Sequence, residues 1–329
     1  MIITRTPFRI SFAGGGSDLA SFYRRHEGCV ISTSINKYMY ITIHPSFNGT
    51  ETTIKYSHTE TVNDIRKIQH PVARQLLIDY NLSGVEITST ADIPSGTGLS
   101  TSSAYTVGLI SALNAFLGKY YSQEKIARRA CEVEIEKLGE PIGKQDQYGT
   151  SVGGLKFIRF MPDETVDVEP VIISSEVRNK LNDNILLFYT GVTHSAGDIL
   201  KDQSKNIVNE GSKFKAQIKM TEQAYEVKEA LMSGNLTRFG EILNEGWELK
   251  KQLSNKISSS MIDSYYDTAL QNGALGGKLL GAGGGGFLLL YCEKEKQKRL
   301  RSALCELPEL PFEMENGGTK VIYIGEKDW

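Results

Sequence analysis

The sequence lacks several patterns that define common classes of protein. Its four cysteines show no CxxC spacing, which argues against a zinc knuckle or a disulfide framework and favours a reducing cytoplasm. Its 37 lysine and arginine residues are balanced by 39 aspartate and glutamate residues, whereas non-specific nucleic-acid binding needs a basic excess. The apolar run from Phe287 to Tyr291 is too short to span a bilayer, and the first segment has no apolar stretch of signal-peptide length. We therefore expect a cytoplasmic monomer or homodimer that binds neither nucleic acid nor a membrane.

Familiar nucleotide and kinase motifs are also missing. The chain contains no GxxxxGK[ST] string of a Walker P-loop and no HRD or DFG string of protein kinases. The run Gly281–Gly286 formally matches GxGxxG, but a strand is predicted after it, where a dinucleotide site needs a helix. We therefore interpret this run as a loop of close backbone approach. The five histidines show no metal-ligand spacing; His194 lies in a predicted loop and is interpreted as solvated, with a substrate contact as the alternative.

The length and the hydrophobic patterning predict two domains. A chain of 329 residues allows about two domains at ~100–200 residues each and can bury a core without disulfides. The first half predicts mixed strands and helices, and the second half predicts long helices interrupted at Gly211, Gly234 and Gly246. We expect an α/β (α+β) protein with domains at 1–175 and 176–329. Strands are predicted over 8–12, 38–44, 85–90, 153–160, 185–189, 278–280, 287–291 and 320–324, and helices over 19–25, 103–117, 122–139, parts of 195–272 and 293–304.

The most informative motif is a glycine-rich turn that leads into a helix. The first turn of a helix exposes unpaired N–H groups and the positive end of the dipole, so it binds anions. A serine that only caps the helix is the alternative, but four consecutive hydroxyl residues exceed what capping needs, so we favour phosphate binding. The motif comprises Pro94, Ser95, Gly96, Thr97, Gly98, Leu99, Ser100, Thr101, Ser102 and Ser103.

Glu134 interrupts the apolar face of the predicted helix over 122–139. At ~100° per residue it aligns with Ala127, Ala130 and Leu138, whereas Glu132 falls on the polar side. An ionised carboxylate among apolar residues is unfavourable unless it is paired or binds a metal. We favour a Mg²⁺ ligand, and a salt bridge to a buried base or a shifted helix register is the alternative.

Lys144 and Asp146 follow that helix in a loop that Pro141 and Gly143 impose. An aspartate here is suited to accept the proton of a substrate hydroxyl, as in phosphoryl transfer. Lys144 would keep Asp146 ionised or contact a phosphate. A polar surface turn is the alternative.

A second candidate loop follows the first predicted strand. Gly15 and Gly16 lead into Ser17 and Asp18. These two polar residues are suited either to cap the helix that follows or, together with the glycines, to bind the vicinal hydroxyls of a sugar. The sequence leaves both interpretations open.

Three motifs in this order resemble those of the GHMP small-molecule kinases, which include galactokinase, homoserine kinase and mevalonate kinase. They are the segments from Pro7 to Asp18, from Pro94 to Ala104, close to the pattern P-x-x-x-G-L-G-S-S, and from Lys278 to Gly286. The resemblance covers essentially the whole chain. It implies an N-terminal domain like ribosomal protein S5 domain 2, a ferredoxin-like C-terminal domain, and a site between them that uses ATP and Mg²⁺.

The resemblance also implies roles for individual residues. Ser100 stands where the family pattern has glycine and Thr101 where it has serine, which leaves a shift of the metal ligand by one residue open. By resemblance, Ser102 and Glu134 would hold Mg²⁺, and Asp146 would be the base or would orient the sugar hydroxyl. Arg9 would stabilise the transferring phosphoryl group, and Asp18 and its neighbours would bind sugar. The phosphate loop would be supported by Gly281, Gly283 and Gly284.

Within this family, the strings GGGSDL and GKQDQY resemble the branch that phosphorylates D-glycero-D-manno-heptose 7-phosphate. That resemblance implies phosphorylation of the anomeric hydroxyl of the α anomer, for nucleotide-activated heptose synthesis. His194 stands where this branch would carry an arginine, so Lys144 and Arg24 are alternatives for binding the sugar's own phosphate. A kinase for L-fucose or galactose is the nearest alternative function, and a non-catalytic sugar or nucleotide sensor is the second.

Overall fold

The computed structural model describes residues 1–192, 196–209 and 211–325, and the prediction for His194 lies outside the described residues. Within these residues, nine strands form one sheet with the order β12-β1-β2-β5-β3-β4, to which β11, β6 and β7 attach through β2. Three more strands form a second sheet with the order β8-β10-β9. The strands are β1 (Ile2–Ala13), β2 (Gly28–Pro45), β3 (Thr52–Lys55), β4 (Thr59–Val62), β5 (Val85–Ala91), β6 (Leu155–Phe160), β7 (Val166–Pro170), β8 (Ile185–Tyr189), β9 (Ala274–Leu279), β10 (Phe287–Cys292), β11 (Met314–Glu315) and β12 (Lys320–Ile324).

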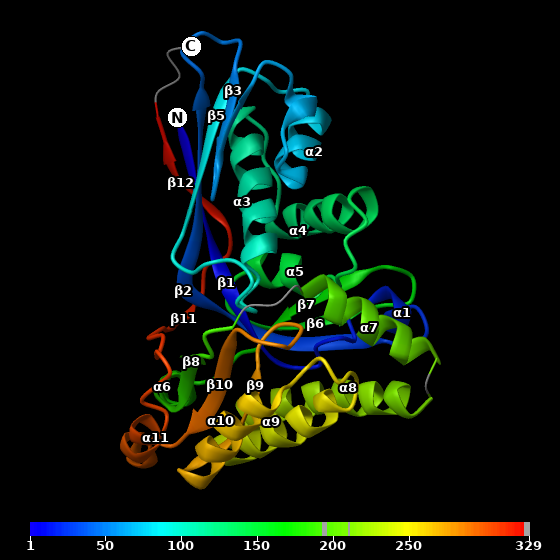
Figure 1. Cartoon of the computed structure of the whole chain (residues 1–329), viewed down its shortest axis with the longest axis vertical. Helices are drawn as coiled ribbons and strands as arrows, with labels where there is room; N and C mark the ends of the chain where they lie inside the picture. The colour runs from blue at the N-terminus through cyan, green and yellow to red at the C-terminus, as the bar shows by residue number, and fades with distance from the viewer. Residues whose placement is uncertain (193–195, 210, 326–329) are drawn as a thin grey trace.

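The helices cover the two sheets. Figure 1 shows α2, α3 and α4 beside the large sheet, and α8, α9 and α10 grouped around the smaller one. The helices are α1 (Ala20–Tyr23), α2 (Pro71–Asp79), α3 (Thr101–Phe116), α4 (Gln123–Cys131), α5 (Gln145–Ser151), α6 (Ser175–Asn184), α7 (Ala196–Asn209), α8 (Gly211–Met232), α9 (Leu236–Lys251), α10 (Ser260–Gln271) and α11 (Gln297–Ala303), with short 3-10 turns η1 (Ile65–Lys67) and η3 (Lys294–Lys296) and a π-helical turn η2 (Glu132–Lys137).

Helix α3 is the central helix of the first half. It is apolar on nearly all sides and buried along most of its length, as a helix enclosed by other elements must be. It lies close to the large sheet because Gly108 has no side chain: a β-carbon there would come within 3.0 Å of Thr6 Oγ1. The Thr4 hydroxyl donates to the Gly108 carbonyl at 3.0 Å. This packing fixes where the first turn of α3 points.

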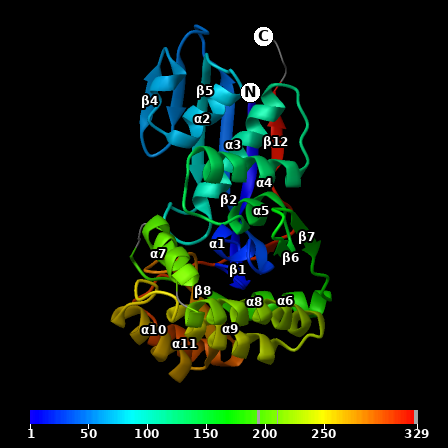
Figure 2. The ribbon, with the colours of Figure 1, turned by 90° about the vertical axis from the view of Figure 1, so that its right-hand side faces the viewer.

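The two halves share one core. The Phe12 ring on β1 meets the Phe239 ring on α9 edge-on, with centroids 5.2 Å apart. The Ile10 side chain of β1 and the Val227 side chain of α8 belong to the same buried cluster. Figure 2 shows α8 and α9 below the strands of the first half, with α7 between the two parts. The groove between the halves is therefore bounded by rigidly packed elements.

Most predicted elements are confirmed, and two predictions differ from the structure. The helix expected over 122–139 begins after the capping residue Ser122, but its second part is the π-helical turn η2, where Leu138 N donates to Val133 O at 3.0 Å. Gly246, predicted to interrupt a helix, lies inside α9, because tertiary packing outweighs the roughly 1 kcal/mol preference for alanine over glycine. The last strand, β12, pairs with β1, so the chain returns to the first sheet. The division into 1–175 and 176–329 stays a prediction.

None of the described helices combines the length and the apolar character needed to cross a membrane.

Candidate active site

A cavity of about 470 Å³ lies where the two halves meet. Arg9 of β1, Glu134 of η2 and Asp146 of α5 line it from the first half. Helix α9, strand β9 and the run from Gly281 line it from the second half. The structure therefore brings together motifs that are far apart in the sequence.

The second part of the phosphate-loop motif lines this cavity. Gly96, Gly98 and the residues from Ser100 to Ser103 face the cavity, whereas Pro94, Ser95, Thr97 and Leu99 do not. The buried Thr97 hydroxyl donates to the Pro94 carbonyl at 3.1 Å and so stiffens the loop. Ser100 has a φ of 65°, and within the described residues its buried Oγ has no hydrogen-bond partner. A left-handed residue with an unpaired hydroxyl beside a helix N-terminus fits a site that completes its hydrogen bonds with an anion.

The glycine run supports the loop through two of its residues. A β-carbon on Gly281 would lie 2.6 Å from the Cα of Gly98, and one on Gly286 would lie 2.4 Å from the Thr97 carbonyl oxygen. Gly283 and Gly284 approach the chain at Ile257 instead, where Gly284 N donates to the Ile257 carbonyl at 2.9 Å. The run thus clamps the loop on one side and the segment before α10 on the other.

Arg9 and Asp146 form an ion pair at the floor of the cavity. Arg9 Nε and Nη2 both donate to Asp146 Oδ1, at 3.0 and 2.5 Å, and Arg9 Nη1 donates to the Gly98 carbonyl at 2.9 Å. The Arg9 side chain is 3 % exposed and that of Asp146 is 32 % exposed. Asp146 also lies in the first turn of α5. The pair therefore places a fixed cation and an accessible carboxylate beside the phosphate loop.

Glu134 is buried within hydrogen-bond reach of α3. Its carboxylate accepts from Ser103 Oγ at 3.0 Å, from Thr106 Oγ1 at 2.8 Å and from Gln147 Nε2 at 2.5 Å. Burial raises the pKa of Glu134 to about 7, although these three hydrogen bonds oppose the shift. The predicted burial of Glu134 on an apolar helix face is confirmed. Within the described residues, its hydrogen-bond partners include no lysine or arginine, so the predicted alternative of a salt bridge is not found there. Ser103 bonds to Glu134, whereas Ser102, the residue expected to share a metal with it, is exposed at the cavity.

The residues that could hold a metal ion do not form a complete protein site. Among the described residues, no group of three or more histidine, cysteine, aspartate and glutamate side chains could hold one. Mg²⁺ in kinase sites takes one or two carboxylates, and phosphate oxygens and water complete its shell. Glu134 with Ser102 or Ser103 fits such a partial donor set, because no ion pair to the buried carboxylate is found within the described residues.

Asp18 and Gln145 form one wall of the cavity. The buried Asp18 carboxylate accepts from Gly16 N at 3.0 Å, Gln145 N at 3.1 Å and Gln145 Nε2 at 3.0 Å. Burial, with the charge of Asp146 adding to it, raises the pKa of Asp18 to about 6. Ser17 points elsewhere, because its hydroxyl bonds to the Cys29 carbonyl at 2.9 Å. Neither residue caps α1, whose capping residue is Leu19, so the capping alternative is wrong.

Lys144 lies outside the cavity lining. Its Nζ donates to Glu164 Oε2 at 2.6 Å and lies 4.6 Å from the centre of the Tyr23 ring. Arg24 Nε binds the same glutamate at 2.6 Å. Both bases suggested for a substrate phosphate are therefore held by Glu164.

Sequence analysis missed several residues that the structure brings to the cavity. Gln145 lies in the loop for which a polar surface turn was the alternative, and no role of its own was predicted for it. Its backbone N–H and its side-chain amide both donate to Asp18, which places it at the cavity. Ser11 Oγ and Gln145 Oε1 are buried and without a hydrogen-bond partner within the described residues. Lys250 of α9 and Lys278 of β9 also line the cavity. The sequence did offer a signal for Lys250, because a charged residue on an otherwise apolar helix face is the pattern that also pointed to Glu134.

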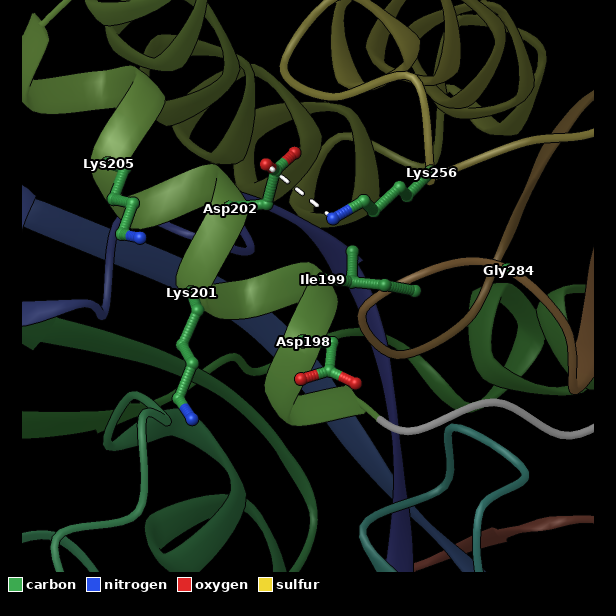
Figure 3. A pocket seen from close by; sticks show the side chains of 7 residues that line it. All are labelled: Asp198, Ile199, Lys201, Asp202, Lys205, Lys256 and Gly284. Atoms are coloured by element: carbon green, nitrogen blue, oxygen red, sulfur yellow. Dashed lines mark ion pairs between the residues drawn. The ribbon is translucent and has the colours of Figure 1, made fainter.

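A second hollow lies on the other side of α7. Figure 3 shows Asp202 of α7 facing Lys256, and the two form an ion pair of 3.7 Å. The Ser254 hydroxyl also donates to Asp202. Asp198, Lys201 and Lys205 complete a rim of mixed charge. Three lysines and two aspartates leave a net charge of only one, so we assign no function to this hollow.

Comparison with known proteins identifies the family. The model of the GHMP kinases N terminal domain matches residues 65–154, and the model of the GHMP kinases C terminal domain matches residues 227–309. Together with the relative described next, these matches show that the chain belongs to the GHMP kinases, whose two-domain fold it has.

Several of the similar proteins are sugar kinases. The chain is 30% identical over 315 residues to the D-glycero-alpha-D-manno-heptose 7-phosphate kinase of Campylobacter jejuni, covering 92% of this chain and 93% of that protein. It is 27% identical to the L-fucokinase/L-fucose-1-P guanylyltransferase of Bacteroides fragilis, over 92% of this chain and 36% of that protein. The crystal structure of a D-glycero-D-manno-heptose 1-phosphate kinase from Bacteroides thetaiotaomicron has a TM-score of 0.82 and 26% identity, covering 99% of this chain and 100% of that one.

Proposed function

We propose that this protein transfers the terminal phosphoryl group of ATP to the anomeric hydroxyl of D-glycero-α-D-manno-heptose 7-phosphate, giving the 1,7-bisphosphate and ADP. The observation that carries the transfer chemistry is the Arg9–Asp146 pair beside the phosphate loop, with Arg9 Nη1 bonded to Gly98. The similarity to heptose kinases over nearly the whole chain supports the choice of sugar.

The residues present can carry out the phosphoryl transfer. The hydroxyl proton of C1 passes to Asp146, the C1 oxygen bonds to the terminal phosphorus, and the bond from phosphorus to ADP breaks. Arg9 orients Asp146 through their ion pair and offers positive charge to the phosphoryl group. The first turn of α3, from Ser100 to Ser103, would hold the phosphate chain.

Mg²⁺ fits Glu134 and one of the two neighbouring serines. Ser103 already bonds to Glu134, and Ser102 is the more accessible hydroxyl at the same turn. When bound, the ion would neutralise charge on the phosphate oxygens. The raised pKa of Glu134 reflects a buried negative charge that such a cation would compensate.

The sugar would bind at Asp18, Gln145 and the backbone of Gly15 and Gly16. These residues line the cavity next to Asp146, so a sugar held there presents a hydroxyl to the base. Ser11 Oγ and Gln145 Oε1, both buried without a partner within the described residues, are further hydrogen-bonding groups for sugar hydroxyls.

L-fucose and galactose are the alternative acceptors. The fucokinase of Bacteroides fragilis and a galactokinase of Pyrococcus furiosus are also similar to this chain, the latter at 26% identity over 68% of it. A sensor without catalysis is the other alternative. The location in the cytoplasm and the state of monomer or homodimer stay predictions.

The test is to incubate the protein with Mg²⁺-ATP and a panel of sugars and sugar phosphates, and to follow ADP release. We expect turnover with heptose 7-phosphate far above that with L-fucose or galactose. Turnover only with a free sugar would contradict the substrate and retain the kinase. ATP binding without ADP release from any acceptor would favour the sensor.

A further inference from the structure

Two buried lysines of the second half face the cavity without a carboxylate partner. Lys250 lies near the end of α9 and Lys278 lies on β9, and each is 7 % exposed. Both line the cavity that contains Arg9 and the phosphate loop. Among the described residues, the ion pairs include neither lysine. A buried ammonium group without a counter-ion is unfavourable, so an anion bound in the cavity would stabilise the charged form of both lysines.

Backbone carbonyls satisfy these lysines only in part. Lys250 Nζ donates to the Leu279 and Gly281 carbonyls, at 3.1 and 2.7 Å, and Lys278 Nζ donates to the Phe12 carbonyl at 3.2 Å. An ammonium group has three N–H donors, so both side chains retain hydrogen-bonding capacity. Burial lowers the pKa of Lys278 to about 7, with repulsion from Arg9 adding to it. Burial also lowers the pKa of Lys250, with Lys278 and Arg9 contributing.

The contacts place Lys250 at the phosphate loop. Its Nζ binds the carbonyl of Gly281, and Gly281 is the residue that packs against the Cα of Gly98. The carbonyl of Gly98 accepts from Arg9 Nη1. Arg9 and Lys250 thus each donate to one glycine of this contacting pair, and Lys278 is close enough to influence the ionisation of Lys250.

We propose that Lys250 and Lys278 bind the terminal phosphoryl group of the nucleotide, together with Arg9. This inference rests on the proposed function, since it assigns two further binding residues to the same site. The three cations come from β1, α9 and β9, so the second half of the chain supplies two of the charges that hold the group being transferred. A phosphate with two or more negative charges would restore the charge balance that the described residues lack.

Lys156 offers a matched control. It is also a fully buried lysine near Arg9, and burial with repulsion from Arg9 lowers its pKa to about 7. Its Nζ donates to Ser34 Oγ at 3.2 Å and to the Gly154 carbonyl at 2.9 Å. It does not line the cavity. A variant at Lys156 therefore reports what the loss of a buried amine does without any loss of ligand contact.

The experiment compares the affinities for Mg²⁺-ATP and Mg²⁺-ADP by calorimetry in K250M, K278M and K156M. We expect K250M and K278M to bind ATP about 10- to 100-fold more weakly than the wild-type protein, as for a lost charge-assisted hydrogen bond. Their affinity for ADP should change little, because ADP lacks the terminal group. K156M should bind both nucleotides as the wild type does, and K278R should recover part of the affinity for ATP. Thermal unfolding of each variant verifies that it is folded.

Four results would overturn the inference, and a fifth would contradict the proposed function itself. Equal weakening of ATP and ADP in K250M and K278M would assign the lysines to structural support of the glycine run. Unchanged ATP affinity with a raised KM for the sugar phosphate would place them at the acceptor. If K250M and K278M do not fold, the K278R variant provides the test instead. If K278R bound ATP no more tightly than ADP, the proposal would be contradicted. A wild-type protein that binds neither nucleotide would contradict the proposed kinase itself, whereas normal turnover with unaffected lysine variants would contradict only this inference.

Discussion

Gly98 and Gly281 lie in backbone contact across the two halves of the chain. Both have positive φ, 84° and 73°, and a β-carbon on either would lie 2.6 Å from a backbone atom on the other side of the contact. The conformation of the phosphate loop therefore depends on a glycine that lies 183 positions further along the chain. Any side chain on either residue must push the loop and the glycine run apart.

The first prediction concerns this contact. G281A should destabilise the protein by about 2 kcal/mol or more, since left-handed strain adds to a backbone overlap. It should also weaken ATP binding, because the loop that faces the phosphates shifts. The control is G49A: Gly49 has a φ of 67° and open space around its β-position, so this variant carries the backbone strain alone. Denaturant unfolding and ATP titration check both variants, and equal effects of the two would contradict the packing argument.

The second prediction concerns the base. D146N should lower kcat by about 10²- to 10⁴-fold, because the amide cannot take the proton of the acceptor hydroxyl. ATP should still bind, since the asparagine oxygen can accept the bonds from Arg9 that Asp146 Oδ1 accepts. Single-turnover kinetics with saturating sugar phosphate measures the chemical step. Near-normal turnover in D146N would show that Asp146 is not the base.

The third prediction is a pH dependence of stability. The pKa of Glu134 is about 7 in the folded protein against an ordinary 4.5, so the folded state binds more protons than the unfolded state between these values. Glu134 therefore destabilises the fold above pH 7, and this effect disappears as the pH falls toward 4.5. E134Q removes it, so the variant should gain up to about 3 kcal/mol over the wild type at pH 8 and little at pH 5.

E132Q is the control for this pH dependence. Glu132 lies on the same turn, is paired with Arg129, and the hydrogen bond from Arg129 lowers its pKa. Its carboxylate favours the folded state at neutral pH, so E132Q should shift stability in the opposite direction and weakly. Urea unfolding at several pH values, without nucleotide, measures both. A gain for E134Q that is the same at pH 5 and pH 8 would contradict the titration argument.

The fourth prediction concerns Ser100. At a φ of 65° a serine is strained where glycine is not, so S100G should stabilise the protein by about 1 kcal/mol. The same change removes the unpaired Oγ that faces the cavity, so ATP should bind more weakly. N81G relieves a left-handed residue with a φ of 47° on the surface and should leave ATP affinity alone. If S100G bound ATP as tightly as the wild type, the hydroxyl would have no part in phosphate binding.

Local patterns in the sequence were sufficient to predict the parts of the site that lie within single elements. The anion-binding start of α3 follows from glycines and hydroxyl residues at adjacent positions, and the burial of Glu134 follows from helical periodicity. The resemblance of three motifs to the GHMP kinases added the family and the order of the domains, which periodicity alone does not reveal. These features depend on neighbours within one or two turns.

Only the tertiary structure decided which side chains meet. Arg9 and Asp146 are 137 positions apart, and their ion pair depends on how β1 packs against α5. The choice of Ser103 over Ser102 as the partner of Glu134 depends on the rotation of α3 and on the π-helical turn η2, which a periodicity of 3.6 residues does not predict. Lys144 is close to Asp146 in the sequence, but its side chain binds Glu164 outside the cavity. Lys250 and Lys278 belong to distant elements, and both line the cavity. The reason is that a sequence pattern determines the face of an element on which a residue lies, and only the packing of elements determines what that face meets.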